Sequence, residues 1–144
     1  MTGNISDRGR EVVEEFLRFD GWMGRYEHLI DMGRSLELID DACRTDEYLV
    51  RGCQSRVWLR AEGDREFIRL TADSDALITK GLVAVLLRVL SGQPASDVAN
   101  ADLTFLDRIG MKEHLSPTRK NGLAAMIKQI RLYALALSHS SEMS

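Results

Sequence analysis

Hydrophobic residues recur every three or four positions in the first quarter of the chain, a spacing that is typical of amphipathic helices. One helix is predicted over residues 7–18 with Ser6 as its cap. A second is predicted over residues 20–32, with Asp20 as its cap and Gly33 placed to end it. The apolar positions that define them are Val12, Val13, Phe16 and Leu17 in the first, and Trp22, Tyr26, Leu29 and Ile30 in the second.

Alternating apolar and polar residues then predict a small antiparallel sheet. Residues 34–45 have a mixed pattern and are expected to form a loop with at most one helical turn. Strands are predicted over residues 48–51, 55–61 and 66–71, and the turn 62–64 contains a glycine that suits a hairpin. In the middle strand, Val57, Leu59 and Ala61 share the face expected to be buried.

The most apolar segment of the chain predicts a central buried helix over residues 75–91. Ser74 or Asp73 is placed to cap it, and Gly92 follows its end. Its apolar residues lie on more than one side, which indicates contacts with several neighbours. They are Leu77, Ile78, Leu82, Val85, Leu86, Val89 and Leu90.

Three further helices are predicted in the C-terminal part, over residues 96–100, 102–109 and 116–138. Pro117 suits the first turn of the last one. Its apolar face consists of Leu123, Met126, Ile127, Ile130, Ala134 and Leu137. The pattern as a whole predicts an α+β fold in which an antiparallel sheet of about three strands packs against several helices.

The length and composition predict one folded domain in the cytoplasm. A chain of 144 residues, 1–144, with 44% apolar residues can bury a core, here expected over about residues 7–138, with a frayed tail at 139–144. Its net charge of -3 gives no reason to expect nucleic acid or an anionic membrane as partner. Residues 81–87 are too short an apolar run to span a bilayer, and the first 19 residues lack the apolar core of a secretory signal.

Cys53 is the candidate reacting residue. Gly52 before it permits the dihedrals of a sharp turn, and strand-forming residues begin just after it, at Ser55. Arg51 and Arg56 flank the turn, and a nearby cation favours the thiolate, which is the nucleophilic form of cysteine. The alternative is that Cys53 is a small apolar filler, as buried cysteines commonly are.

The remaining residues exclude most other cysteine chemistry. No local motif places His28, His114 or His139 as a base for a cysteine hydrolase. Two cysteines are too few for the usual zinc or iron-sulfur sites, and phosphate loops and dinucleotide fingerprints are missing. We therefore expect no metal site and no cofactor. A nucleophilic cysteine without these aids suits thiol exchange.

Several motifs spread between about residues 16 and 137 strengthen this interpretation. They are Gly52-Cys53-Gln54-Ser55 with Val57-Trp58, Asp73-Ser74-Asp75-Ala76, Lys80-Gly81-Leu82, His114-Leu115-Ser116-Pro117-Thr118-Arg119, and Gly122-Leu123 with Met126-Ile127. Together they resemble the SufE family of sulfur acceptors, which includes SufE and its paralogue CsdE. The resemblance implies the fold that this family shares with IscU.

The resemblance also implies a function. It suggests that Cys53 takes persulfide sulfur from a pyridoxal-phosphate-dependent cysteine desulfurase, SufS- or CsdA-like, and stimulates its turnover. The sulfur then passes to an iron-sulfur cluster assembly scaffold. Pyridoxal phosphate belongs to the desulfurase, so the chain would be a persulfide carrier and not a stand-alone enzyme.

Five other residues are candidates for supporting this loop or contacting the partner. Gly52 shapes the turn, and Gln54 and Ser55 can hydrogen-bond the loop or a bound sulfur. Arg119 can meet the partner or the cysteine loop through its guanidinium group. Asp75 is either a helix-cap residue or a support of the loop.

Two other functions stay open: a cluster scaffold, and a module that regulates a desulfurase without accepting sulfur. Cys43 departs from the family pattern and is interpreted as incidental, although a disulfide with Cys53 or a resolving role is conceivable at this spacing. The sequence does not decide between the SufE and CsdE paralogues, nor whether the protein forms a homodimer.

Overall fold

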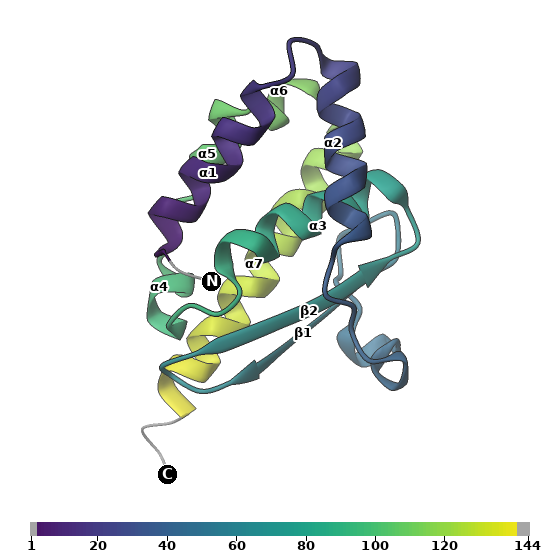
Figure 1. The fold of residues 1–144 in the computed structure, drawn as a ribbon. Coiled ribbons are helices and arrows are strands. Elements are labelled where there is room, and N and C mark those ends of the chain that lie inside the picture. The colour runs from purple at the N-terminus through teal and green to yellow at the C-terminus, as the bar shows by residue number, and fades with distance from the viewer. Residues whose placement is uncertain (1–2, 141–144) are drawn as a thin grey trace.

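The computed structural model describes residues 3–140, with Lys112 and Ser140 described by their backbone alone. Its elements are α1 (Ile5–Leu17), α2 (Trp22–Arg34), η1 (Asp41–Cys43), η2 (Asp46–Tyr48), β1 (Val57–Gly63), β2 (Ile68–Ser74), α3 (Leu77–Leu90), α4 (Ala95–Ala99), α5 (Phe105–Arg108), α6 (Met111–His114) and α7 (Pro117–Ser140). Figure 1 shows α3 between the α1–α2 pair and the β1–β2 hairpin, with α7 alongside it. The predicted α+β class is confirmed.

The first two helices differ from prediction at their ends. Asn4, not Ser6, caps α1, because its side chain accepts a hydrogen bond from the Asp7 N–H while the Asp7 carboxylate accepts one from the Asn4 N–H. Leu17 is 52% exposed and does not join the buried stripe. Gly21, not Asp20, caps α2, and no side chain bonds there.

Helix α2 continues past Gly33 to Arg34, so the prediction that Gly33 ends it is wrong. A β-carbon built at Gly33 would lie 3.0 Å from the backbone nitrogen of Gly81 on α3. One built at Gly81 would lie 2.4 Å from the carbonyl oxygen of Leu29. These two glycines therefore allow the backbones of α2 and α3 to approach closely.

The sheet has two strands within the described residues, and the predicted third strand is wrong. β1 and β2 pair antiparallel from Val57↔Ser74 to Gly63↔Ile68. Residues 48–51 contribute only the isolated bridge Leu49↔Trp58, because the chain turns away after it into the loop that carries Cys53. Val57 and Leu59 are completely buried, as their alternation predicted, whereas Ala61 on the same face is only partly buried.

Helix α3 is the buried central helix, as predicted, but it starts later. Its N-cap is Ala76, without a side-chain hydrogen bond, and Leu77 is 66% exposed. Asp73 and Ser74 lie in β2, so neither caps α3. The Asp73 carboxylate forms ion pairs instead, and the Ser74 hydroxyl donates to the Arg56 carbonyl.

The last helix begins after Ser116, whose hydroxyl accepts a hydrogen bond from the Arg119 N–H at 3.3 Å. It extends to Ser140, so the helix does not end at residue 138, and the rest of the predicted frayed tail, 141–144, lies outside the described residues. Helix α6 was not predicted; the ring of His114, its last residue, stacks on Trp22, with centroids 3.9 Å apart. Among the described residues, no helix has the length and apolar character needed to cross a membrane.

Candidate functional site

The loop that carries Cys53 is closed at its base by the protein core. Val50 and Val57 flank it, both are buried, and the Val50 N–H donates a hydrogen bond to the Val57 carbonyl at 2.8 Å. Gly52 has φ +95°, a left-handed conformation that disfavours other residues. A β-carbon there would also lie 3.2 Å from Cβ of Ala125 on α7. The glycine thus shapes the turn that presents Cys53.

The second leg of the loop is fastened to the junction between β2 and α3. The Arg56 N–H donates to Asp75 Oδ1 at 3.1 Å. The Arg56 carbonyl accepts from the Ser74 hydroxyl at 2.8 Å and from the Asp75 N–H at 3.3 Å. Ser74 and Asp75 therefore hold the loop, which explains why they do not cap α3.

A cavity of about 350 Å³ opens beside Cys53, between its loop, the start of α3 and the first turns of α7. Gln54, Ser55 and Arg119 line it together with Cys53. Gly52 and Asp75 do not line it, since they shape and fasten the loop instead. The other lining residues are Thr79, Leu82, Ser116, Thr118, Gly122 and Met126.

The Cys53 sulfur is half-buried against α7. Its Sγ lies 3.5 Å from the Gly122 carbonyl oxygen, to which the thiol can donate a weak hydrogen bond. Burial raises the pKa of this thiol. The expectation that Arg51 and Arg56 favour the thiolate is wrong for this conformation, because both side chains are exposed and solvent screens them.

Gly122 is a part of the site to which the sequence analysis gave no role. It is buried within α7, and a β-carbon there would lie 3.6 Å from Cys53 Sγ. A glycine in the interior of a long helix costs helix stability, which is the signal that indicates a close neighbour at this position. The neighbour is the Cys53 sulfur, the candidate reacting atom.

Polar side chains line the cavity, and none of its lining residues is a histidine. The hydroxyls of Ser55, Ser116 and Thr118 line it, and Arg119 is exposed, with no ion pair to any residue in the described range 3–140. Its guanidinium is therefore available to an anionic group in the cavity. The three histidines of the chain lie elsewhere.

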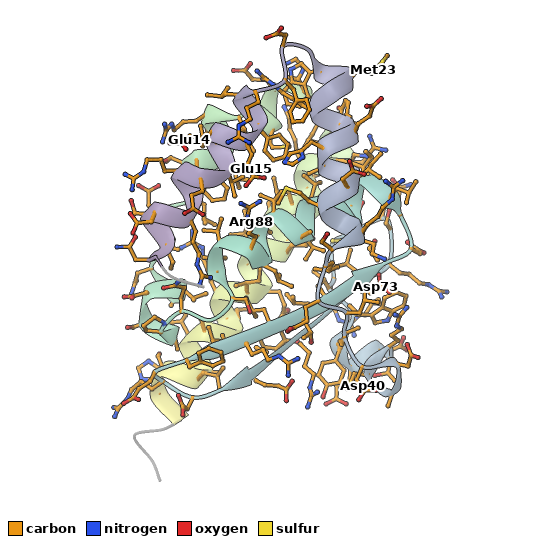
Figure 2. All side chains as sticks on the ribbon, viewed as in Figure 1. Glu14, Glu15, Met23, Asp40, Asp73 and Arg88 are labelled. Atoms are coloured by element: carbon orange, nitrogen blue, oxygen red, sulfur yellow. The ribbon has the colours of Figure 1, made fainter. Side chains whose placement is uncertain are left out.

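Asp73 anchors the region next to the loop. Its buried carboxylate pairs with Arg44 at 2.6 Å and with Lys80 at 3.3 Å, and it accepts a hydrogen bond from the Ser74 N–H. Figure 2 shows Asp73 where β2 passes the segment that holds η1 and η2. The carboxylate joins that segment and α3 to the sheet, so the prediction that Asp73 caps α3 is wrong.

The second cysteine, Cys43, does not line the cavity beside Cys53. Cys43 ends η1 and is a free, half-buried thiol, as is Cys53. Within the described residues, no three histidine, cysteine, aspartate or glutamate side chains are grouped so that they could hold a metal ion.

Comparison with known proteins gives the chain its family. The model of the SufE family, described as an Fe-S metabolism associated domain, matches residues 10–134. An uncharacterized SufE-like protein of Rhizobium meliloti is 41% identical over 126 residues, which cover 84% of this chain and 90% of the relative. A similar protein of Rhizobium etli is 40% identical over 126 residues, covering 84% of this chain and 85% of the relative.

The fold has a counterpart among solved structures. The solution structure of a hypothetical protein from Thermus thermophilus superposes with a TM-score of 0.77, covering 92% of this chain and 97% of that one at 18% identity. At this identity the likeness concerns the fold. The match over residues 10–134 and the two close relatives establish that the chain belongs to the SufE family.

Proposed function

We propose that this protein is a sulfur acceptor that takes persulfide sulfur from a pyridoxal-phosphate-dependent cysteine desulfurase on Cys53 and passes it to an iron-sulfur cluster assembly scaffold. Membership of the SufE family, associated with iron-sulfur metabolism, supports this role. The observation that carries it is Cys53 Sγ at the wall of a polar cavity, on a short loop fastened at both legs.

The proposed step is a thiol exchange. The Cys53 thiol loses its proton to water, and the thiolate attacks the outer sulfur of the desulfurase persulfide. The sulfur-sulfur bond of the donor breaks, its electron pair leaves on the desulfurase thiolate, and a new sulfur-sulfur bond forms on Cys53. One bond forms as one breaks, so no external oxidant or reductant is needed.

The cavity suits the product of this step. A persulfide on Cys53 carries a negative charge when it ionises, and Arg119 with the hydroxyls of Ser55 and Thr118 supplies a cation and hydrogen-bond donors beside it. Half-burial protects the sulfur from oxidation while the protein is free, since oxidation follows exposure and thiolate character. Delivery to a partner therefore involves a change around the sulfur, either movement of the loop or the approach of a partner's charged group.

The decisive experiment is mass spectrometry after incubation with a cysteine desulfurase and cysteine. The peptide that contains Cys53 should gain one sulfur, about 32 Da, and the gain should disappear on reduction. The variant Cys53→Ser should show no gain. If the Cys53 peptide of the parent protein stays unmodified, the proposal is wrong.

The matched control is Cys43→Ser, which should accept sulfur as the parent protein does. Desulfurase turnover should be measured on the same samples. A sulfur acceptor loses its stimulation of turnover in Cys53→Ser, whereas a module that only regulates the desulfurase keeps it. A large loss in Cys43→Ser would instead give the second thiol a part in the relay.

A further inference from the structure

A second hollow, a groove of about 590 Å³, lies between α5 and α7, away from Cys53. Its apolar lining comes from both helices and the segment before α5: Leu103, Leu106, Leu123, Ala124, Ile127 and Leu132. We propose that this groove binds an acidic amphipathic helix of a partner protein. This binding site goes beyond the proposed function and does not depend on it.

The charge around the groove selects the partner. Lys120, Lys128 and Arg131 line it from α7, against the single carboxylate of Asp107. Neither Lys120 nor Lys128 has an ion pair with another described residue, and the Arg131 guanidinium donates hydrogen bonds to the Ala99 and Ala101 carbonyls. The net charge of the whole chain is -3, but these three cations make the groove locally positive. The groove therefore attracts carboxylates.

The apolar lining continues beyond the groove along α7. Leu132 and Leu135 are 49% and 45% exposed, and Leu135 lies about one turn past Arg131. From Ala124 to Leu135 the helix extends about 18 Å, at 1.5 Å per residue. This length fits a partner helix of about three turns whose apolar residues recur at i, i+3, i+4 and i+7.

Other occupants fit these features less well. A second copy of the chain docked here about a twofold axis would bring Lys120, Lys128 and Arg131 of both copies near one another, and like charges repel. Nucleic acid would place phosphates over an apolar floor, and a flat bilayer does not fill a hollow. A helix with one apolar and one acidic face can pack on the apolar lining and pair with the basic residues beside it.

The groove and the Cys53 cavity use different sides of α7. Thr118, Arg119, Gly122 and Met126 line the cavity, whereas the groove is lined by residues from Lys120 to Leu132 that lie about half a turn away around the helix. A helix bound in the groove therefore leaves the Cys53 loop free to meet another protein.

The test is the binding of a fluorescein-labelled synthetic helix, with leucines at i, i+3, i+4 and i+7 and glutamates beside them, followed by fluorescence anisotropy. The variant carrying Lys120→Glu and Lys128→Glu should bind about tenfold more weakly, and so should Leu132→Asp. All three residues are exposed, so folding should be retained, as circular dichroism would verify. The control Arg18→Glu, an exposed charge at the C-cap of α1, should bind as the parent protein does.

Changes in the amide chemical shifts of the isotope-labelled protein show where the peptide binds. Residues 103–107 and 120–132 should respond to the peptide, and residues 51–56 should not. The proposal is overturned if the peptide does not bind, if a scrambled peptide binds equally, or if the double variant binds unchanged. Competition by anionic lipid vesicles, or self-association through this face, would likewise overturn it.

Discussion

On the proposed function, the thiol of Cys53 must be protected while the protein is free and reactive when it meets a partner. Its half-buried position beside the Gly122 carbonyl meets the first demand by disfavouring the charged thiolate. Reactivity must then come from a change in its surroundings, either movement of the loop or the arrival of a partner's charge.

This burial predicts the pH dependence of Cys53 alkylation. Because the pKa of the folded thiol is raised, less thiolate is present at neutral pH. The alkylation rate of Cys53 should therefore be slower in the folded protein than in the same protein unfolded in urea. Its increase with pH should also occur at a higher pH in the folded protein. The measurement uses iodoacetamide on the Cys43→Ser variant, in which Cys53 is the single thiol. A folded-state midpoint at or below the unfolded one would contradict the proposed protection.

At the scale of elements, the loop is fastened to the β2–α3 junction through Asp75 and Ser74. The Asp75 carboxylate can therefore determine how often the loop opens. A hydrogen bond of this kind contributes about 0.5–1.5 kcal/mol, enough to change an opening equilibrium by up to about tenfold.

Asp75→Ala should consequently speed the alkylation of Cys53, by up to about tenfold, in the Cys43→Ser background. Asp64→Ala is the matched control, because Asp64 also accepts backbone hydrogen bonds, from the Glu66 and Phe67 N–H groups, but in the β1–β2 turn. The control should lower stability without altering alkylation. Equal rates in both variants would show that Asp75 does not restrain the loop.

At the scale of the whole molecule, one carboxylate joins three helices. Glu15 on α1 pairs with Arg88 on α3 and lies 3.1 Å from His28 Nε2 on α2. Figure 2 shows Glu15 and Arg88 between α1 and α3. The hydrogen bond from Arg88, together with its charge and His28, lowers the pKa of Glu15, although partial burial opposes this.

The lowered pKa sets the sign of a pH effect on stability. A carboxyl whose pKa falls on folding stabilises the protein above its unfolded pKa, and this contribution is lost as the pH falls through the folded value. Glu15→Gln should therefore be less stable than the parent protein in urea unfolding at neutral pH, with a difference that shrinks below pH 4.5, the ordinary value for glutamate. Asp31→Asn, in an exposed pair with Arg34, should show little difference at either pH.

Local patterns were sufficient for most elements, and they singled out Cys53, whose side chain the structure places beside a cavity. Helical periodicity located α1, α2, α3 and α7, and the glycine before Cys53 indicated the turn. They failed where a residue serves a distant neighbour. Gly33 is a residue type that often ends helices, but here it allows α3 to approach closely. Ser74 and Asp75 are residue types that often cap helices, but here they bind the Arg56 backbone.

By itself, the sequence determined the α+β class, the buried central helix and the SufE-like motif around Cys53, because these depend on periodicity and on residue types that are adjacent in the chain. Only the tertiary structure decided that Gln54, Ser55 and Arg119 share a cavity with Cys53, and that burial, not a nearby arginine, governs its thiol. Both depend on how α7 packs against the loop. That packing brings together residues far apart in sequence, whose distances no local pattern encodes.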